Sequence, residues 1–77
     1  MTKLHNQMKI KNVTTNKIAV AAGININSMW AYKYGHKDIS KANLKTILKI
    51  CEVIGCKVVD ILDDQELIEL INKANFK

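Results

Sequence analysis

The apolar residues of this chain recur at steps of three and four, a spacing that aligns side chains along one face of an α-helix. Proline is absent and glycine occurs at three positions, so few residues interrupt the pattern. Helices are predicted over residues 2–11, 14–22, 26–34 and 40–54, followed by a short helix within 58–64 and a last one that begins at 63 or 64. We therefore expect an all-α fold made of short helices.

The boundaries of the second and third helices predict a specific motif. Thr14 or Thr15 can cap the start of the second helix, and Gly23 can end it in the left-handed conformation. Asn25 can cap the third helix, and Gly35 follows its last residue. Two helices of about eight residues, joined by a turn of about three residues that contains glycine, are typical of a helix-turn-helix.

The fourth helix is expected to begin at Ser40, whose hydroxyl can cap it. An apolar stripe at helical spacing follows, formed by Leu44, Ile47, Leu48, Cys51 and Ile54. The last helix also has an apolar side, formed by Leu67, Ile68, Leu70 and Ile71. This side either folds back and completes the core or forms a dimer contact. We accordingly expect a domain over 1–63 and a C-terminal helical extension over 64–77.

Charge is distributed unevenly along the chain. Up to Lys57 there are ten lysines against Asp38 and Glu52, a balance of +8, whereas the remainder carries −3. A basic body with an acidic tail favours a polyanionic partner for the body, although lysines also simply keep a small protein in solution. The chain contains no arginine, so it lacks the planar fork that reads guanine through two bonds, whereas lysine can hold phosphate as a point charge.

Residues that could carry catalysis are sparse. Cys51 and Cys56 lie among apolar residues and far from either histidine, so we expect reduced packing residues rather than a metal site. We find no Ser–His, Cys–His or paired-carboxylate arrangement, and we expect no enzyme, no cofactor and no small-molecule substrate. No apolar run approaches the roughly 18–20 residues that span a bilayer. The N-terminal stretch lacks a signal-peptide core, so we expect a cytoplasmic protein without a membrane partner.

The third helix has two distinct faces when its residues are placed at 3.6 residues per turn. Met29 and Tyr32 point to one side, which we expect to face the core. The opposite side carries Asn27, Ala31 and Tyr34, with Trp30 beside them. Two of the four aromatic residues would thus point outward in the most basic part of the chain.

The ordered features from Leu4 to about Asp63 resemble the Cro and phage-repressor type of helix-turn-helix, also called the xenobiotic-response-element family. "VTTNKIAVAAGI" matches its second helix and turn, and "ISKANLKTILKICEVIGCKVVDIL" is similar to a subgroup in which both cysteines are core residues. The resemblance implies a compact five-helix lambda-repressor-like domain with an additional short C-terminal helix. The chain departs from the family pattern at Asn12, Thr15 and Tyr34, and in its lack of arginine.

In this family the third helix enters the major groove, and residues at its start read base edges. Asn27 is the first candidate, because an amide can pair with adenine through two bonds, while Ile26 and Ala31 can touch a thymine methyl. The expected base contacts are Ile26, Asn27, Trp30 and Ala31, and the expected phosphate contacts are Thr15, Lys17, Ser28, Lys33, Tyr34, His36, Lys37 and Lys41.

Several of these residues have a second interpretation. Asn27 is equally compatible with a solvated position in the first helical turn, and Tyr34 with simple surface exposure. Ile26 can instead staple the start of the helix to the core, which we favour. Trp30 can pack under a neighbouring segment, which we favour over direct contact with DNA.

We predict a DNA-binding transcriptional regulator, a repressor of a bacterial or phage operon, that binds a two-fold symmetric double-stranded operator as a homodimer. The alternative is a protein-interaction module of helix-turn-helix shape, as in an antitoxin or an anti-activator. The arrangement of charge discriminates between them. Lysines beside Asn27 favour DNA, whereas acids around Trp30 and Tyr34 favour a protein partner.

Overall fold

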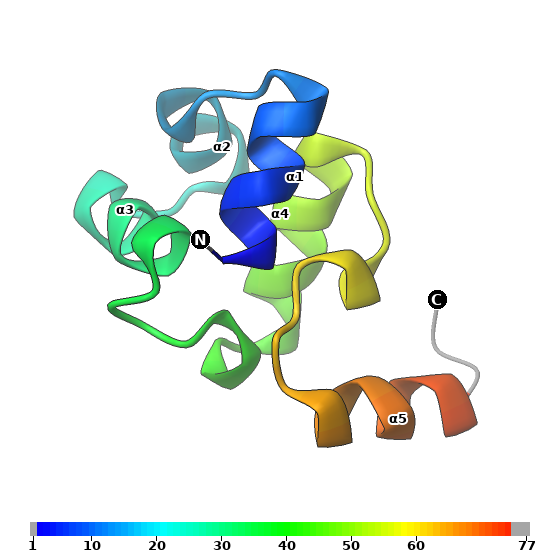
Figure 1. The fold of residues 1–77 in the computed structure, drawn as a ribbon. Coiled ribbons are helices and arrows are strands. Elements are labelled where there is room, and N and C mark those ends of the chain that lie inside the picture. Colours follow the sequence, from blue (N-terminus) through cyan, green and yellow to red (C-terminus); the bar gives the residue numbers. More distant parts are fainter. Residues whose placement is uncertain (1, 75–77) are drawn as a thin grey trace.

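A computed structural model describes residues 2–74 and confirms an all-helical fold in this part of the chain (Figure 1). The α-helices are α1 (Lys3–Lys11), α2 (Thr15–Ala22), α3 (Ile26–Tyr34), α4 (Leu44–Ile54) and α5 (Gln65–Lys73). Two single turns of 3-10 helix, η1 (Ile39–Lys41) and η2 (Val58–Asp60), lie on either side of α4 in the chain. The short helix expected within 58–64 is therefore a 3-10 turn. The last three residues of the expected C-terminal extension, 75–77, lie outside the described part.

The core lies between α1, α2, α3 and α4 and is closed by the residues around η2. Its largest fully buried side chains come from all of these segments: Leu4, Ile18, Met29, Ile50, Ile61 and Leu62. Cys51 is buried as expected, while Cys56 is only partly buried, and both are free thiols. Burial raises the pKa of Cys51 to about 12, so this residue stays a neutral thiol and behaves as a small apolar side chain.

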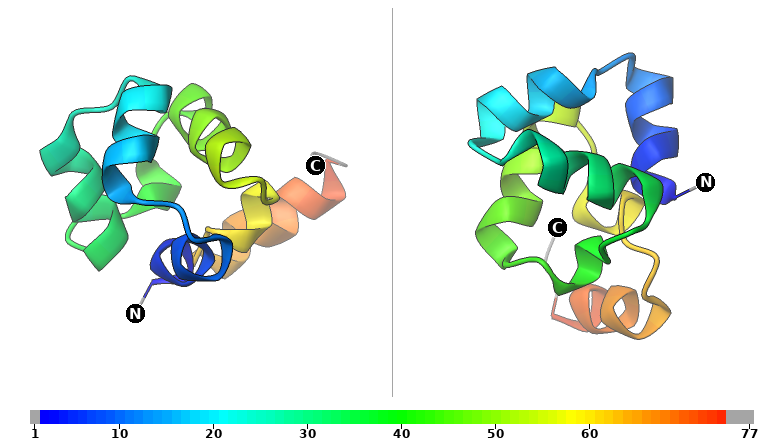
Figure 2. Two further views of the ribbon diagram at one scale, coloured as in Figure 1. Left: turned by 90° about the horizontal axis from the view of Figure 1, so that it is seen from above. Right: turned by 90° about the vertical axis from the view of Figure 1, so that its left-hand side faces the viewer.

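The helix-turn-helix is formed by α2 and α3. Gly23 ends α2 in the left-handed conformation at φ 68°, where a residue without Cβ is unstrained. The Asn25 side chain then accepts a hydrogen bond from the backbone N–H of Asn27 at 2.8 Å and caps α3. In the right-hand view of Figure 2, α3 crosses the front of the molecule and its outer side is uncovered by the other helices.

The start of α4 differs from the sequence-based expectation. Asp38 accepts a hydrogen bond from the N–H of Ser40 and caps η1, so Ser40 lies inside this 3-10 turn and cannot cap α4. The cap of α4 is Asn43, which accepts from the N–H of Thr46 at 2.8 Å. Within α4, Ile50 is buried, whereas Leu44 and Leu48 are 52% and 39% exposed. The buried side of α4 is therefore formed by Ile47, Ile50, Cys51 and Ile54, and it does not include the two leucines of the predicted stripe.

The first turn of α1 is fastened to the end of α3. The Thr2 hydroxyl donates to the carbonyl oxygen of Lys33 at 2.6 Å and also accepts from the N–H of His5 at 3.0 Å. The His5 ring meets the Tyr34 ring edge to face, with centroids 5.4 Å apart. Gly35 is held closely as well, because a Cβ there would lie 3.2 Å from Thr2 Cγ2. These contacts fix the C-terminal end of α3 against the rest of the molecule.

Helix α5 lies at the edge of the molecule, beyond η2 (Figure 1). Asp64, one of the two positions at which this helix was expected to begin, caps it by accepting a hydrogen bond from the N–H of Leu67. Leu67, Ile68 and Ile71 are partly buried against the core, but Leu70 is 54% exposed and no residue of α5 is fully buried. The helix folds back on the domain, yet its apolar side is only partly covered.

Asn43→Ala should destabilise the protein by about 1 kcal/mol, because it removes the side chain that satisfies the Thr46 N–H. Ser40→Ala is the matched control, since the Ser40 hydroxyl is buried without a hydrogen-bond partner among the described residues and its removal should cost little. Urea unfolding followed by circular dichroism measures both changes. A larger loss for Ser40→Ala than for Asn43→Ala would place the start of α4 at Ser40.

The His5 ring should make stability depend on pH. Desolvation lowers its pKa from the ordinary value of 6.5, and the Lys33 ammonium lowers it further. Because the unfolded chain then binds a proton more readily than the folded one, the stabilising effect is full above the unfolded pKa and is lost as pH falls through the folded pKa. We expect the free energy of unfolding to fall as the pH drops through and below the ordinary histidine pKa of 6.5. His5→Gln should show a smaller fall, and an equal fall in both proteins would remove His5 as its source.

Candidate nucleic-acid interface

The outward side of α3 contains most of the predicted base-reading residues. Met29 is fully buried and Tyr32 is partly buried, which confirms the expected inward face of the helix. On the other side Asn27 is exposed and Ala31 is half-buried. Ile26 is partly buried against the core, which supports its role as a staple of the helix start. Asn27 is thus more exposed than Ile26, the other residue at the start of α3.

Trp30 and Tyr34 form an exposed stacked pair one helical turn apart, here named the aromatic shelf. Their ring centroids are 5.4 Å apart, the planes differ by 6°, and the side chains are 40% and 52% exposed. The ammonium of Lys33 lies 4.7 Å from the centroid of the Trp30 ring and 5.3 Å from that of the Tyr34 ring. A cation over the ring faces is an attractive arrangement. Trp30 is therefore partly packed and partly accessible.

The basic residues after α3 partly fold back towards its start. Lys37 Nζ donates to the Ser28 hydroxyl at 3.3 Å and lies 5.9 Å from the centroid of the Tyr32 ring. His36 and Lys41 are exposed in the segment between α3 and α4, and Lys17 is exposed on α2. The structure thus joins Ser28 and Lys37, two predicted phosphate contacts that are nine residues apart, next to Asn27.

Asp38 is an acidic residue within this basic segment. Its carboxylate accepts the N–H of Ser40 at 2.9 Å, so it serves a local structural purpose as the cap of η1. The Asp38 carboxylate is therefore hydrogen-bonded at the start of η1.

The position of Thr15 differs from the expectation that its side chain contacts phosphate. It is 4% exposed, and its hydroxyl is buried with no hydrogen-bond partner among the described residues. As the first residue of α2, it turns its side chain inward and does not present its hydroxyl to the solvent. A phosphate contact by this side chain is therefore contradicted.

Sequence reasoning missed the residues that surround Trp30 on its other side. A hollow of about 430 Å³ separates Trp30 from the end of α1 and the start of α2, and Lys9 and Asn16 line it together with Lys33. Lys9 therefore places another cation on the hollow that Trp30 of α3 lines. This placement depends on how α1 crosses α3, and no local pattern in the sequence reveals that crossing.

Other kinds of site receive no support from the described residues. Over residues 2–74, no three His, Cys, Asp or Glu side chains are grouped so that they could hold a metal ion. None of the described helices has both the length and the apolar character needed to cross a membrane. The surface that combines exposed polar, aromatic and cationic groups is the one around α3.

Comparison with known protein families matches residues 3–66 to the Cro/C1-type HTH DNA-binding domain. No curated protein and no solved structure was found to match the chain. The family match covers α1 to α4, both 3-10 turns and the beginning of α5, and it therefore includes the whole helix-turn-helix. The chain belongs to the Cro/C1-type family of helix-turn-helix DNA-binding domains.

Proposed function

We propose that this protein is a sequence-specific transcriptional regulator, a repressor, whose helix α3 enters the major groove of double-stranded DNA. The observation that carries the proposal is the composition of the outward side of α3. The Asn27 amide is exposed there, and the neighbouring Ser28 hydroxyl is bound by the Lys37 ammonium. A major groove about 12 Å wide admits one helix with such a surface.

Base reading is assigned chiefly to Asn27. Its own backbone is fixed by the Asn25 cap, so its side chain leaves the first turn of α3 in a defined direction. An amide pairs with adenine N6 and N7 through two hydrogen bonds. Ala31 lies one turn further along, where a small side chain lets the helix approach the bases and touch a thymine methyl. Ile26 contributes at most its outer atoms, because it is partly buried.

Phosphate binding is assigned to the cations and hydroxyls around α3. Lys17 on α2 and Lys37 and Lys41 after α3 would neutralise phosphates on either side of the groove, and the His36 ring N–H can donate a hydrogen bond to a phosphate oxygen. Ser28 and the Tyr34 hydroxyl can donate to phosphate oxygens, and Lys33 adds charge from the aromatic shelf. Release of counterions from each neutralised phosphate makes the affinity strongly dependent on salt.

A protein partner is the second candidate function, because the aromatic shelf exposes two large rings. The charge next to these rings favours DNA, since the side chain in contact with both is Lys33. Asp63 lines a hollow beyond Tyr34 but does not surround the shelf.

We further propose that the repressor acts in the cytoplasm on a two-fold operator, as a homodimer.

Selection from a random DNA pool should yield a two-fold symmetric consensus, against which Asn27→Ala is then measured. Loss of a two-bond contact with adenine should weaken binding to the consensus by about 1–3 kcal/mol, with a much smaller loss on random DNA. Fluorescence anisotropy on both duplexes gives the two affinities. An equal loss on both would remove Asn27 from base reading, and a pool without any enriched sequence would favour the protein-partner function.

Lys37→Ala should change the salt dependence without changing the preferred sequence. Removing one phosphate contact should lower the slope of log K against log salt by about 1. Lys57→Ala is the matched control, because Lys57 is exposed at the start of η2, and Figure 1 shows this turn on the far side of α1 and α4 from α3. A Lys37→Ala protein that selects a different consensus would show that Lys37 reads bases instead.

A further inference from the structure

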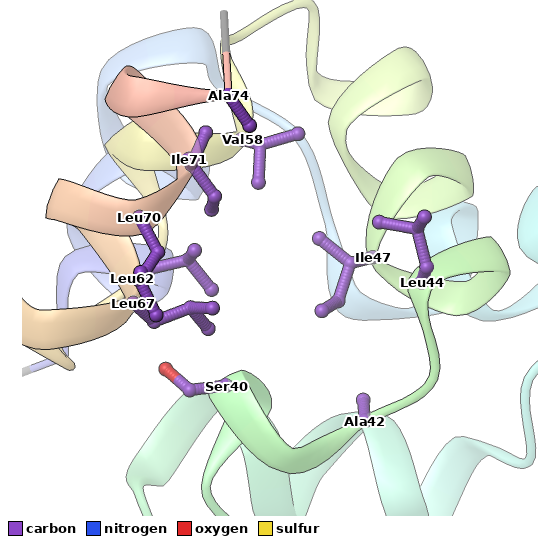
Figure 3. Close-up of a pocket in the computed structure, with 10 residues that line it drawn as sticks. All are labelled: Ser40, Ala42, Leu44, Ile47, Val58, Leu62, Leu67, Leu70, Ile71 and Ala74. Atoms are coloured by element: carbon purple, nitrogen blue, oxygen red, sulfur yellow. The ribbon is translucent and has the colours of Figure 1, made fainter. Parts of the chain in front are cut away.

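The hollow of about 430 Å³ between α1, the start of α2 and α3 is within the size range of small-molecule sites. Its lining combines three kinds of group, namely the Trp30 ring, the apolar side chains of Met8 and Val13, and the ammonium groups of Lys9 and Lys33. The hollow between α4 and α5 in Figure 3 differs, because its lining is almost wholly apolar. A ring and cations in one hollow suit a ligand that is both planar and anionic.

The charge of the lining favours an anion. None of the described residues that line this hollow is Asp or Glu, whereas Lys9 enters from α1 and Lys33 from α3. The His5 ring lines the same hollow and is affected by this charge. Desolvation lowers the pKa of His5, and the ammonium groups of Lys33 and Lys9 lower it further. Two cations without a carboxylate leave a positive potential that attracts a negatively charged ligand.

Helix α2 begins in the wall of this hollow. Its first two residues, Thr15 and Asn16, both line the hollow, and their backbone N–H groups have no acceptor within the helix. The Thr14 hydroxyl accepts from the N–H of Lys17, so it does not satisfy these two donors. The Thr15 side chain is 4% exposed, and its hydroxyl has no hydrogen-bond partner among the described residues. An anionic oxygen held in the hollow would give these groups a partner.

We propose that this hollow binds a nucleoside monophosphate, with the phosphate at the start of α2 and the base against Trp30. A phosphate monoester carries about 1.5 to 2 negative charges at neutral pH, which matches Lys9 and Lys33 better than the single charge of a carboxylate. Trp30 is 40% exposed, so part of its ring is open to stacking with a base. The exposed amides of Asn12 and Asn16 line the hollow and can hydrogen-bond to the base.

The buried hydroxyl of Thr15 distinguishes this ligand from DNA. The hydroxyl is turned away from solvent, so a DNA phosphate outside the hollow does not reach it. A phosphate inside the hollow lies next to Thr15, and rotation about the Cα–Cβ bond brings the hydroxyl to a phosphate oxygen. The resulting hydrogen bond to a charged group satisfies a donor that is otherwise buried without a partner.

The ligand would regulate DNA binding, and this step rests on the proposed function. Lys33 is shared between the hollow and the group of cations that we assign to phosphate binding. A bound nucleotide neutralises this ammonium and adds negative charge beside α3, which repels the DNA backbone. The affinity for DNA should therefore fall by roughly tenfold when the ligand is bound, and DNA should weaken ligand binding by the same factor.

Trp30 is the only tryptophan in the chain, so its fluorescence reports on the hollow. The full chain, without DNA, is titrated with adenosine monophosphate, adenosine and inorganic phosphate, and calorimetry measures the same three affinities independently. Adenosine monophosphate should bind saturably and roughly tenfold or more tightly than either of its parts, because it engages the ring and the cations together. Absence of saturable binding, or binding no tighter than that of adenosine or inorganic phosphate, would overturn the inference.

Two variants test the assigned contacts. Lys9→Ala and Thr15→Val should each weaken the binding of adenosine monophosphate by roughly tenfold, since each removes a hydrogen bond to a charged group. Lys11→Ala is the matched control, because Lys11 is an exposed lysine on the same helix as Lys9 and lines a different hollow. It should leave the affinity unchanged, and an equal loss for both lysine variants would contradict a specific site. Circular dichroism should show all three variants folded, because Thr15→Val removes a hydroxyl without a partner.

The regulatory step is tested by fluorescence anisotropy of the selected DNA duplex, with and without saturating adenosine monophosphate. The DNA affinity of the unmodified protein should fall by roughly tenfold, and an unchanged affinity would overturn the regulatory step. A protein that binds the nucleotide but not DNA would overturn the proposed function alone. A protein that binds DNA but not the nucleotide would overturn the inference alone.

Discussion

Burial of Met29 is the constraint on which the outward side of α3, the proposed DNA-binding surface, depends. With this side chain fully buried and Tyr32 partly buried one turn on, the rotation of α3 about its own axis is fixed. Asn27 must then face outward, because the two directions on a helical wheel are nearly opposite. The Thr2 hydrogen bond to the Lys33 carbonyl and the His5–Tyr34 contact hold the far end of the same helix. Rotation and tilt of α3 are thus set by different parts of the chain.

Local patterns predicted the features that local physics controls. The first helix, the left-handed Gly23 and the Asn25 cap each depend on residues within one or two turns, and all three predictions agree with the structure. The predicted start of α4 was wrong because this segment contains more than one residue that can cap a helix. Ser40 has a suitable side chain, but its N–H donates to the Asp38 carboxylate, which places Ser40 inside η1. Asn43 caps α4 instead.

The details of the candidate site were less predictable, because they depend on contacts between distant segments. The inward turn of Thr15 follows from how the start of α2 packs, and a cap-like residue at a helix start gives no sign of this burial. Lys9 reaches the neighbourhood of Trp30 only through the crossing of α1. The Lys37–Ser28 bond likewise requires the chain to fold back after α3. Sequence reasoning predicted which side of α3 faces outward, but it could not give the contacts among the residues on that side.

The contact of Lys33 with the aromatic shelf bears on how a domain without arginine can recognise DNA. Lysine offers a mobile point charge, whereas arginine offers a rigid planar fork. Here the Trp30 and Tyr34 rings hold the Lys33 ammonium on one side of α3, and the carbonyl end of this helix lies close by, which favours a cation. Fixing the charge before DNA arrives lowers the entropy lost on binding. The two aromatic residues on the outward side of α3 thus position a cation, and Asn27 is the residue for which we propose the directional contact with a base.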